Sequence, residues 1–180
     1  MGDEQLSVNE EQFRFTWDGR NGEAYPHYKR IRDGLFQKWD LLCALHGRRE
    51  LSIPPVSGWT VRYSNCIPRG TVWTSLADCS FCRLFPRFDE QPGRLAPTVL
   101  EGKWQFEAAR PQAEFLIECR SSLADGPLRL PCIWIDLECR GCGEGTAEEA
   151  ACGLDQGREL IVTTFRSLMA PAANAYWGLE

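Results

Sequence analysis

The sequence predicts an α+β fold in which one N-terminal amphipathic helix packs on a mainly antiparallel β-sheet structure. Three observations favour this class: one long helical pattern near the start, several short runs of alternating apolar residues after it, and two Cys-x-x-Cys pairs among those runs. The chain has 180 residues, 43% of them hydrophobic, which is enough for a domain with an apolar core.

The first elements follow from local pattern. Residues 1–12 are acidic and polar, so we expect a disordered arm, followed by a single globular domain over residues 13–180. Residues 13–17 alternate aromatic and polar side chains before Asp18-Gly19, which predicts a short strand ending in a turn. Residues 26–47 predict the helix, because their apolar residues recur at spacings of three and four and Gly47 suits its end.

After the helix the apolar pattern changes to a period of two. We expect strands at WTVRYSN (59–65), TVWTSL (71–76), EFLIECR (114–120), CIWIDLE (132–138) and ELIVTTF (159–165). RFDEQPGRLAP (87–97) predicts an exposed loop, and residues 143–157 predict either a mobile loop or a weak helix.

Net charge and hydropathy limit the function classes. The net charge of −5 gives no nucleic-acid signal over the whole chain. No run approaches the roughly 20 apolar residues of a membrane-spanning helix, and the acidic N-terminus does not resemble a secretory signal. We therefore expect a cytoplasmic protein without membrane insertion.

The nine cysteines are the main chemical signal. An odd count without a signal peptide argues against a disulfide scaffold. Cys79 and Cys82 form one Cys-x-x-Cys pair, Cys139 and Cys142 form a second, and each pair follows a predicted strand. Four thiolates suit tetrahedral zinc, so we predict a structural Zn²⁺ site that joins two zinc knuckles and is closed to substrate.

Three alternatives to this zinc site remain open. One pair could bind zinc together with Cys43 and His46, which lie one helical turn apart. The pairs could be redox-active, although neither begins a helix in a βαβ pattern, or they could be free thiols. Cys119 shares a strand face with apolar residues and is expected in the core. The remaining cysteines, Cys66, Cys132 and Cys152, are given no role in the zinc site.

The layout of Cys79, Cys82, Cys139 and Cys142 resembles the β-sheet zinc modules of the Yippee and cereblon type, which also use two widely separated Cys-x-x-Cys pairs. The resemblance covers those four residues and their strand context. It implies an analogous fold and says little about function.

A cysteine-dependent enzyme is a second reading. Asn65-Cys66 resembles the Asn-Cys element of viral and cellular permuted cysteine enzymes, which implies a thiol enzyme centred on Cys66 with His27-Tyr28 as its His-aromatic pair. The histidine of those enzymes lies on a strand, whereas His27 opens the predicted helix. Asp136 and Glu138 share a strand face and could bind a cation or face solvent. The phosphate-loop and hydrolase motifs are absent, so we expect no enzyme and no small-molecule substrate.

The helix also carries a basic surface that could bind RNA or phospholipid. Its six basic residues are Lys29, Arg30, Arg32, Lys38, Arg48 and Arg49. The alternative is an amphipathic helix with a solvated basic face.

Two further resemblances concern short segments. FRFTWDG (13–19) and RDGLFQKWD (32–40) are similar to the leader proteins of kobuvirus-type picornaviruses. This similarity implies a viral accessory protein, acting in the host cytoplasm on host or viral proteins, in genome replication, encapsidation or host antagonism. SLADCSFCRLF (75–85) resembles the cysteine segment near the start of fungal heterokaryon-incompatibility proteins. We therefore expect a non-enzymatic, zinc-binding interaction or regulatory protein.

Overall fold

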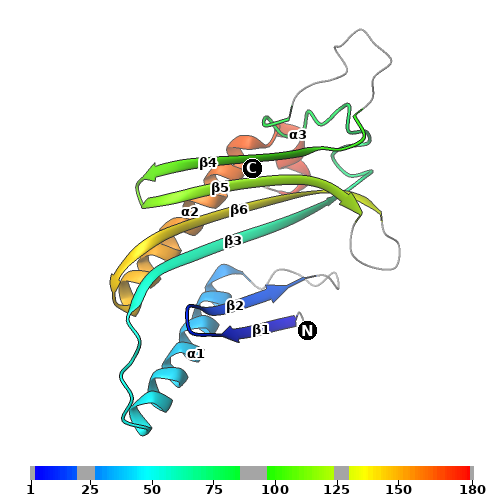
Figure 1. Cartoon of the computed structure of the whole chain (residues 1–180). Coiled ribbons are helices and arrows are strands. Elements are labelled where there is room, and N and C mark those ends of the chain that lie inside the picture. The colour runs from blue at the N-terminus through cyan, green and yellow to red at the C-terminus, as the bar shows by residue number, and fades with distance from the viewer. Residues whose placement is uncertain (1–2, 20–26, 86–96, 124–129, 179–180) are drawn as a thin grey trace. The chain divides into compact units, whose positions relative to one another are not determined.

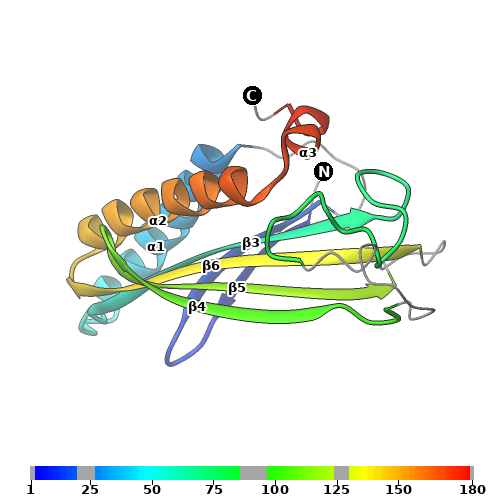
Figure 2. The ribbon, with the colours of Figure 1, turned by 90° about the horizontal axis from the view of Figure 1, so that it is seen from above.

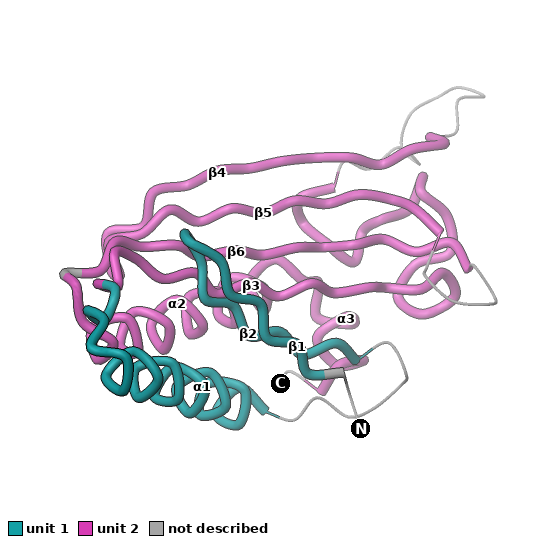
Figure 3. Tube along the Cα trace, turned by 60° about the horizontal axis from the view of Figure 1, so that its bottom comes forward, with its two compact units in different colours: residues 1–54 teal, residues 55–180 magenta. Residues whose placement is uncertain are grey.

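The computed structural model describes residues 3–19, 27–85, 97–123 and 130–178. They belong to two compact units, residues 1–54 and residues 55–180 (Figure 3). The sequence instead predicts one domain over 13–180 after a disordered arm. Most of the predicted loop at 87–97 lies outside the described residues.

The first unit consists of a β-hairpin and a helix. β1 (Asp3–Val8) pairs antiparallel with β2 (Phe13–Asp18), and α1 spans Tyr28–Arg48. The rings of Phe13 and Trp39 meet edge to face with centroids 5.4 Å apart, which joins the hairpin to the helix. The strand at 13–17 and the helix are therefore confirmed. Residues 3–8, which the sequence predicts as part of a disordered arm, form β1, and pairing with β2 provides partners for their backbone groups.

The second unit is built on a four-stranded antiparallel sheet in the order β3-β6-β5-β4 (Figure 1). Its strands are β3 (Val56–Pro68), β4 (Glu101–Ala109), β5 (Gln112–Leu123) and β6 (Pro131–Gly145). The predicted strands at 59–65, 114–120 and 132–138 are confirmed. The predicted strand at 71–76 is wrong, because this segment belongs to the loop after β3, where the Trp73 indole donates a hydrogen bond to the Ile67 carbonyl (2.9 Å).

A long C-terminal helix covers this sheet. α2 (Ala147–Leu168) lies along one face of the sheet and is followed by the short α3 (Pro171–Tyr176) (Figures 1 and 2). The Thr146 hydroxyl accepts a hydrogen bond from the Glu149 amide (3.2 Å) and thereby caps the start of α2. The predicted strand at 159–165 is wrong, because Leu154, Gly157 and Ile161 are buried at helical spacing.

The core of the second unit lies between α2 and β6. Ile133, Ile135, Leu137 and Cys139 alternate along β6 towards the core and are fully buried. The helix on the main sheet is therefore C-terminal, whereas the sequence predicts an N-terminal one. Within the described ranges, no helix is long and apolar enough to cross a membrane.

Candidate functional site: the groove between β3 and α2

The first cysteine pair lies in the loop between β3 and β4. Cys79 and Cys82 are each 1% exposed. The loop is fixed to the end of α2, since the Arg83 amide donates to the Leu168 carbonyl and the Ala170 amide donates to the Phe81 carbonyl, both at 2.8 Å. Burial raises the pKa of both thiols to about 11, so they are protonated at neutral pH.

The second cysteine pair lies entirely within strand β6. Cys139 and Cys142 pair with Val61 and Gly58 of β3. Residues three apart on a strand point to opposite faces, about 10 Å apart along the chain. One zinc ion with bonds of about 2.3 Å cannot reach both sulfurs. In this structure β6 continues as a strand through residues 139–142, where the predicted knuckle requires a turn.

The expected four-cysteine arrangement is consequently not formed. Cys139 faces the core and Cys142 is exposed on the other face, while Cys79 and Cys82 belong to the loop. Among the described residues, no group of three or more His, Cys, Asp or Glu side chains is placed to hold a metal ion.

The remaining cysteines occupy varied surroundings. Cys119 is 2% exposed, which confirms its predicted core position, and burial raises its pKa to about 12. Cys132 is also buried, and its sulfur lies 3.8 Å from the Ser122 hydroxyl. Cys152 on α2 is exposed and accepts a hydrogen bond from the Gln156 amide (3.4 Å).

The other candidate histidine and cysteine residues are not gathered into a described site. His46 lies on α1 with its Nδ1 2.9 Å from the Ser52 carbonyl oxygen, and Cys43 lies one turn earlier. Burial, and next the nearby Asp40, raises the pKa of Cys43. His27 precedes α1 in the first unit, whereas Cys66 belongs to β3 in the second.

Carboxylates engage three of the six basic residues that the sequence suggested for binding. Lys29 contacts Asp33 at 2.5 Å, and Arg30 contacts Glu4 at 3.3 Å. Arg32 lies 3.8 Å from Asp33 and stacks on the Phe36 ring. The other three, Lys38, Arg48 and Arg49, are exposed, and Arg48 lies in the last turn, where a cation favours the helix dipole.

The sheet face opposite α2 carries a charged network. Asp136 is 3% exposed, and its Oδ2 accepts hydrogen bonds from Arg62 (2.9 Å) and Arg120 (3.0 Å). Arg140 contacts both Glu138 (2.6 Å) and Glu114 (3.1 Å). Arginines therefore surround the Asp136 and Glu138 carboxylates that the sequence suggested for a cation.

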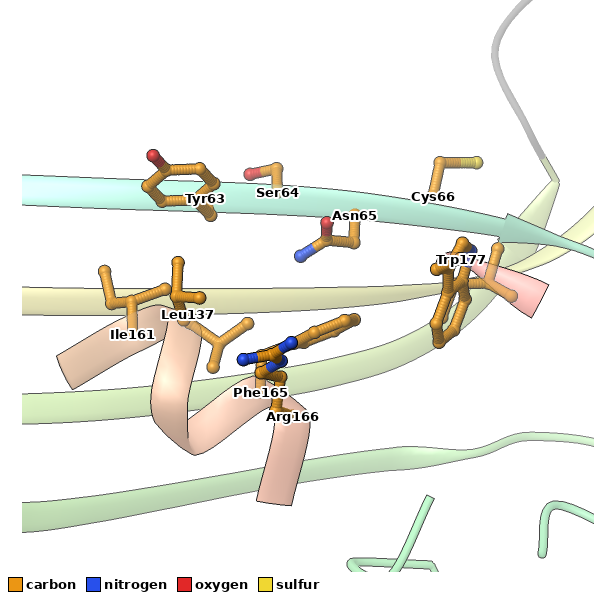
Figure 4. Close-up of a pocket in the computed structure, with 11 residues that line it drawn as sticks. Tyr63, Ser64, Asn65, Cys66, Leu137, Ile161, Phe165, Arg166 and Trp177 are labelled. Atoms are coloured by element: carbon orange, nitrogen blue, oxygen red, sulfur yellow. The ribbon is translucent and has the colours of Figure 1, made fainter. Parts of the chain in front are cut away.

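A groove between β3 and α2 is the candidate site that the structure adds (Figure 4). Its volume is about 400 Å³, within the roughly 300–1,000 Å³ of ligand pockets. Its lining residues come from β3, β6, α2 and the end of α3: Tyr63, Ser64, Asn65, Cys66, Ile67, Leu137, Ile161, Val162, Phe165, Arg166 and Trp177.

The groove has an apolar floor and an aromatic end. Leu137 is fully buried and Ile161 is 2% exposed, so both are held rigidly beneath it. The rings of Phe165 and Trp177 pack at 5.5 Å and form one end. This combination of apolar lining with a few polar groups is typical of recognition sites.

Most polar side chains of the groove come from β3. The Asn65 side chain points toward α2 and donates to the Ile135 carbonyl (3.3 Å), whereas Ser64 and Cys66 point to the opposite side of β3 (Figure 4). Arg166 supplies one positive charge.

The sequence pattern does not reveal this groove, because the β-branched content of residues 159–165 predicts a strand there. The helical spacing of Leu154, Ile161 and Phe165 was the available signal.

Comparison of the chain with protein-family models, with curated proteins and with solved structures found no match.

Proposed function

We propose that this protein is a non-enzymatic interaction module that binds apolar side chains of a partner protein in the groove between β3 and α2. The observation that carries the proposal is the groove itself. It has a volume of about 400 Å³ and an apolar floor, and Asn65 and Arg166 lie at its boundary. A sheet edge beside an apolar groove is one of the settings in which proteins bind extended peptides.

Several features support binding as its role. The floor residues Leu137 and Ile161 are fixed by the core, so the site is formed before a partner arrives, which lowers the entropy cost of association. Phe165 and Trp177 provide large aromatic surfaces of the kind that dominate binding energy at interfaces. The charged residue of the groove, Arg166, would affect the orientation of the partner more than the affinity of binding.

A display selection tests this function. Random twelve-residue peptides are selected against the whole chain, and enriched peptides are measured by titration against two variants. Val162→Glu puts a charge in the groove wall, whereas Thr163→Glu puts the same charge on the neighbouring, exposed position of α2 outside the lining. We expect apolar peptides that bind wild type and Thr163→Glu equally and bind Val162→Glu at least about tenfold more weakly.

Circular dichroism must show that both variants retain the wild-type fold. The proposal is overturned if the selection enriches no peptide, or if the enriched peptides bind Val162→Glu as tightly as wild type.

A further inference from the structure

The residues that form the β3 wall of the groove are consecutive in sequence. All five positions from Tyr63 to Ile67 line it, although alternate side chains of a strand point to opposite faces. A pocket beneath the sheet would be lined by every second residue. The wall is therefore the backbone edge of β3, which is one of the two edge strands of the four-stranded sheet.

Hydrogen bonding fixes which backbone groups face this edge. The Arg69 amide donates to the Pro131 carbonyl (2.8 Å), and the register between β3 and β6 is unbroken from Pro68 back to Gly58. Antiparallel strands alternate between residues that bond to the neighbour and residues that point away from it. The odd-numbered residues of β3 thus bond to β6, and Arg62 and Ser64 direct their N–H and C=O groups away from it.

The two edge strands of the sheet differ in how strongly they discourage pairing with another chain. β4 carries Glu101, Lys103 and Glu107 along nine residues, and such charges discourage pairing with another chain. In β3, Arg62 is the single charged residue between Trp59 and Ile67. A long edge with few charges is the kind that accepts an additional strand.

We propose that the groove binds an extended segment of a partner protein as an added strand along β3. This inference rests on the proposed function and specifies its binding mode. The segment pairs with the backbone of Arg62 and Ser64, and its alternate side chains point into the groove against Val162 and Phe165, which are partly exposed. The segment therefore has apolar residues at every second position.

The first experiment measures backbone pairing from the peptide side. A groove-binding peptide from the selection is synthesised with single N-methyl groups at successive positions, and each version is titrated against the whole chain. In strand addition every second peptide amide faces β3. We therefore expect N-methylation to lower the binding affinity about tenfold or more at alternate positions, and to change it little at the positions between them. If the affinity does not alternate with the methylated position, strand addition is overturned. The proposed function is left intact as long as the unmodified peptide binds Val162→Glu more weakly than wild type.

The second experiment uses β3 itself. Ser64→Pro removes an N–H that points away from β6, so the sheet keeps its own ladder and the variant is expected to fold. We expect Ser64→Pro to bind the peptide at least about tenfold more weakly, and the matched Ser64→Ala to bind it like wild type. Equal binding by Ser64→Pro and Ser64→Ala overturns the pairing.

Other occupants give different results. If the chain without peptide is a dimer that Ser64→Pro converts to a monomer, the occupant is a second copy and the proposal of a partner segment is overturned. If dodecanoate binds wild type and Ser64→Pro alike and displaces the peptide from both, the groove is an acyl-chain site and strand addition is again overturned.

Discussion

The indole of Trp59 lies directly against Gly153 of α2: a Cβ at position 153 would fall 2.1 Å from the indole nitrogen. Gly157, one turn later, would place its Cβ 2.6 Å from the same ring, and Gly141 of β6 would place its Cβ 2.5 Å away. Three glycines from two elements thus form a slot that holds Trp59, which is 9% exposed. This slot sets how closely α2 approaches the sheet and therefore positions one wall of the groove.

Gly153→Ala is expected to destabilise the protein. Replacement of a helical glycine by alanine normally stabilises a helix by about 1 kcal/mol, but here the added methyl collides with a buried ring, at a cost of about 1–3 kcal/mol. The free energy of unfolding in urea measures the effect. Gly47→Ala is the control, because a Cβ at that position in α1 meets nothing within 4 Å. A Gly153→Ala protein as stable as Gly47→Ala would contradict the Trp59 slot.

Asp136→Asn is also expected to destabilise the second unit. The carboxylate is 3% exposed and accepts hydrogen bonds from two arginines, whose side chains are each about half exposed. The arginines can turn to water, which limits the cost of losing the carboxylate. We expect the free energy of unfolding in urea to fall by about 1–3 kcal/mol.

A neighbouring pair on the same face provides the control for Asp136. Glu118 lies opposite Asp136 in the β5–β6 register and contacts the exposed Lys103 at 2.7 Å. Such an exposed pair contributes at most about 1 kcal/mol, so Glu118→Gln should change the stability less. Equal effects of Glu118→Gln and Asp136→Asn would mean that Asp136 is not buried.

The sequence predicts much of the sheet but little of the site, for identifiable reasons. The strands at 114–120 and 132–138 follow from alternation and β-branched content, which are local properties. The segment 159–165 has the same β-branched content, yet Leu154, Gly157 and Ile161 bury a helical face, so tertiary packing outweighs local preference.

The cysteine spacing predicts a turn that the structure does not contain, for a related reason. A Cys-x-x-Cys pair marks a knuckle only when the chain turns between the two residues. The Arg140-Gly141 pair looked like such a turn, but Gly141 is required instead by the close approach of Trp59, and the strand continues through it. That requirement comes from β3, about 80 residues earlier in the chain, and no local pattern reveals it.

Buried thiols predict a loss of stability at alkaline pH. Burial raises the pKa of Cys139 from 9.0 to about 11, so between these pH values the unfolded chain has lost the proton and the folded chain keeps it. The stability contributed by this group is complete below pH 9 and falls above it by about 1.4 kcal/mol per pH unit. Cys79, Cys82 and Cys119 act in the same direction.

The slope of unfolding free energy against pH tests this expectation between pH 9 and pH 10.5. Cys139→Ala should reduce the steepness of the fall by about 1 kcal/mol per pH unit, whatever its effect on absolute stability. Gly47→Ala, which removes no titratable group, should leave the slope unchanged. If Cys139→Ala has the wild-type slope, Cys139 is not buried as a neutral thiol.

Metal content tests whether β6 continues through the second cysteine pair. Because Cys139 and Cys142 point to opposite faces of the strand, Cys142 cannot share an ion with Cys139. We therefore expect Cys142→Ser to have the same zinc content per chain as wild type, and the same urea midpoint, when both are purified without chelator and measured by mass spectrometry. Cys79→Ser gives the comparison for the first pair. Loss of one tightly held zinc in both Cys79→Ser and Cys142→Ser would instead establish a four-cysteine clamp, which requires the chain to turn between Cys139 and Cys142.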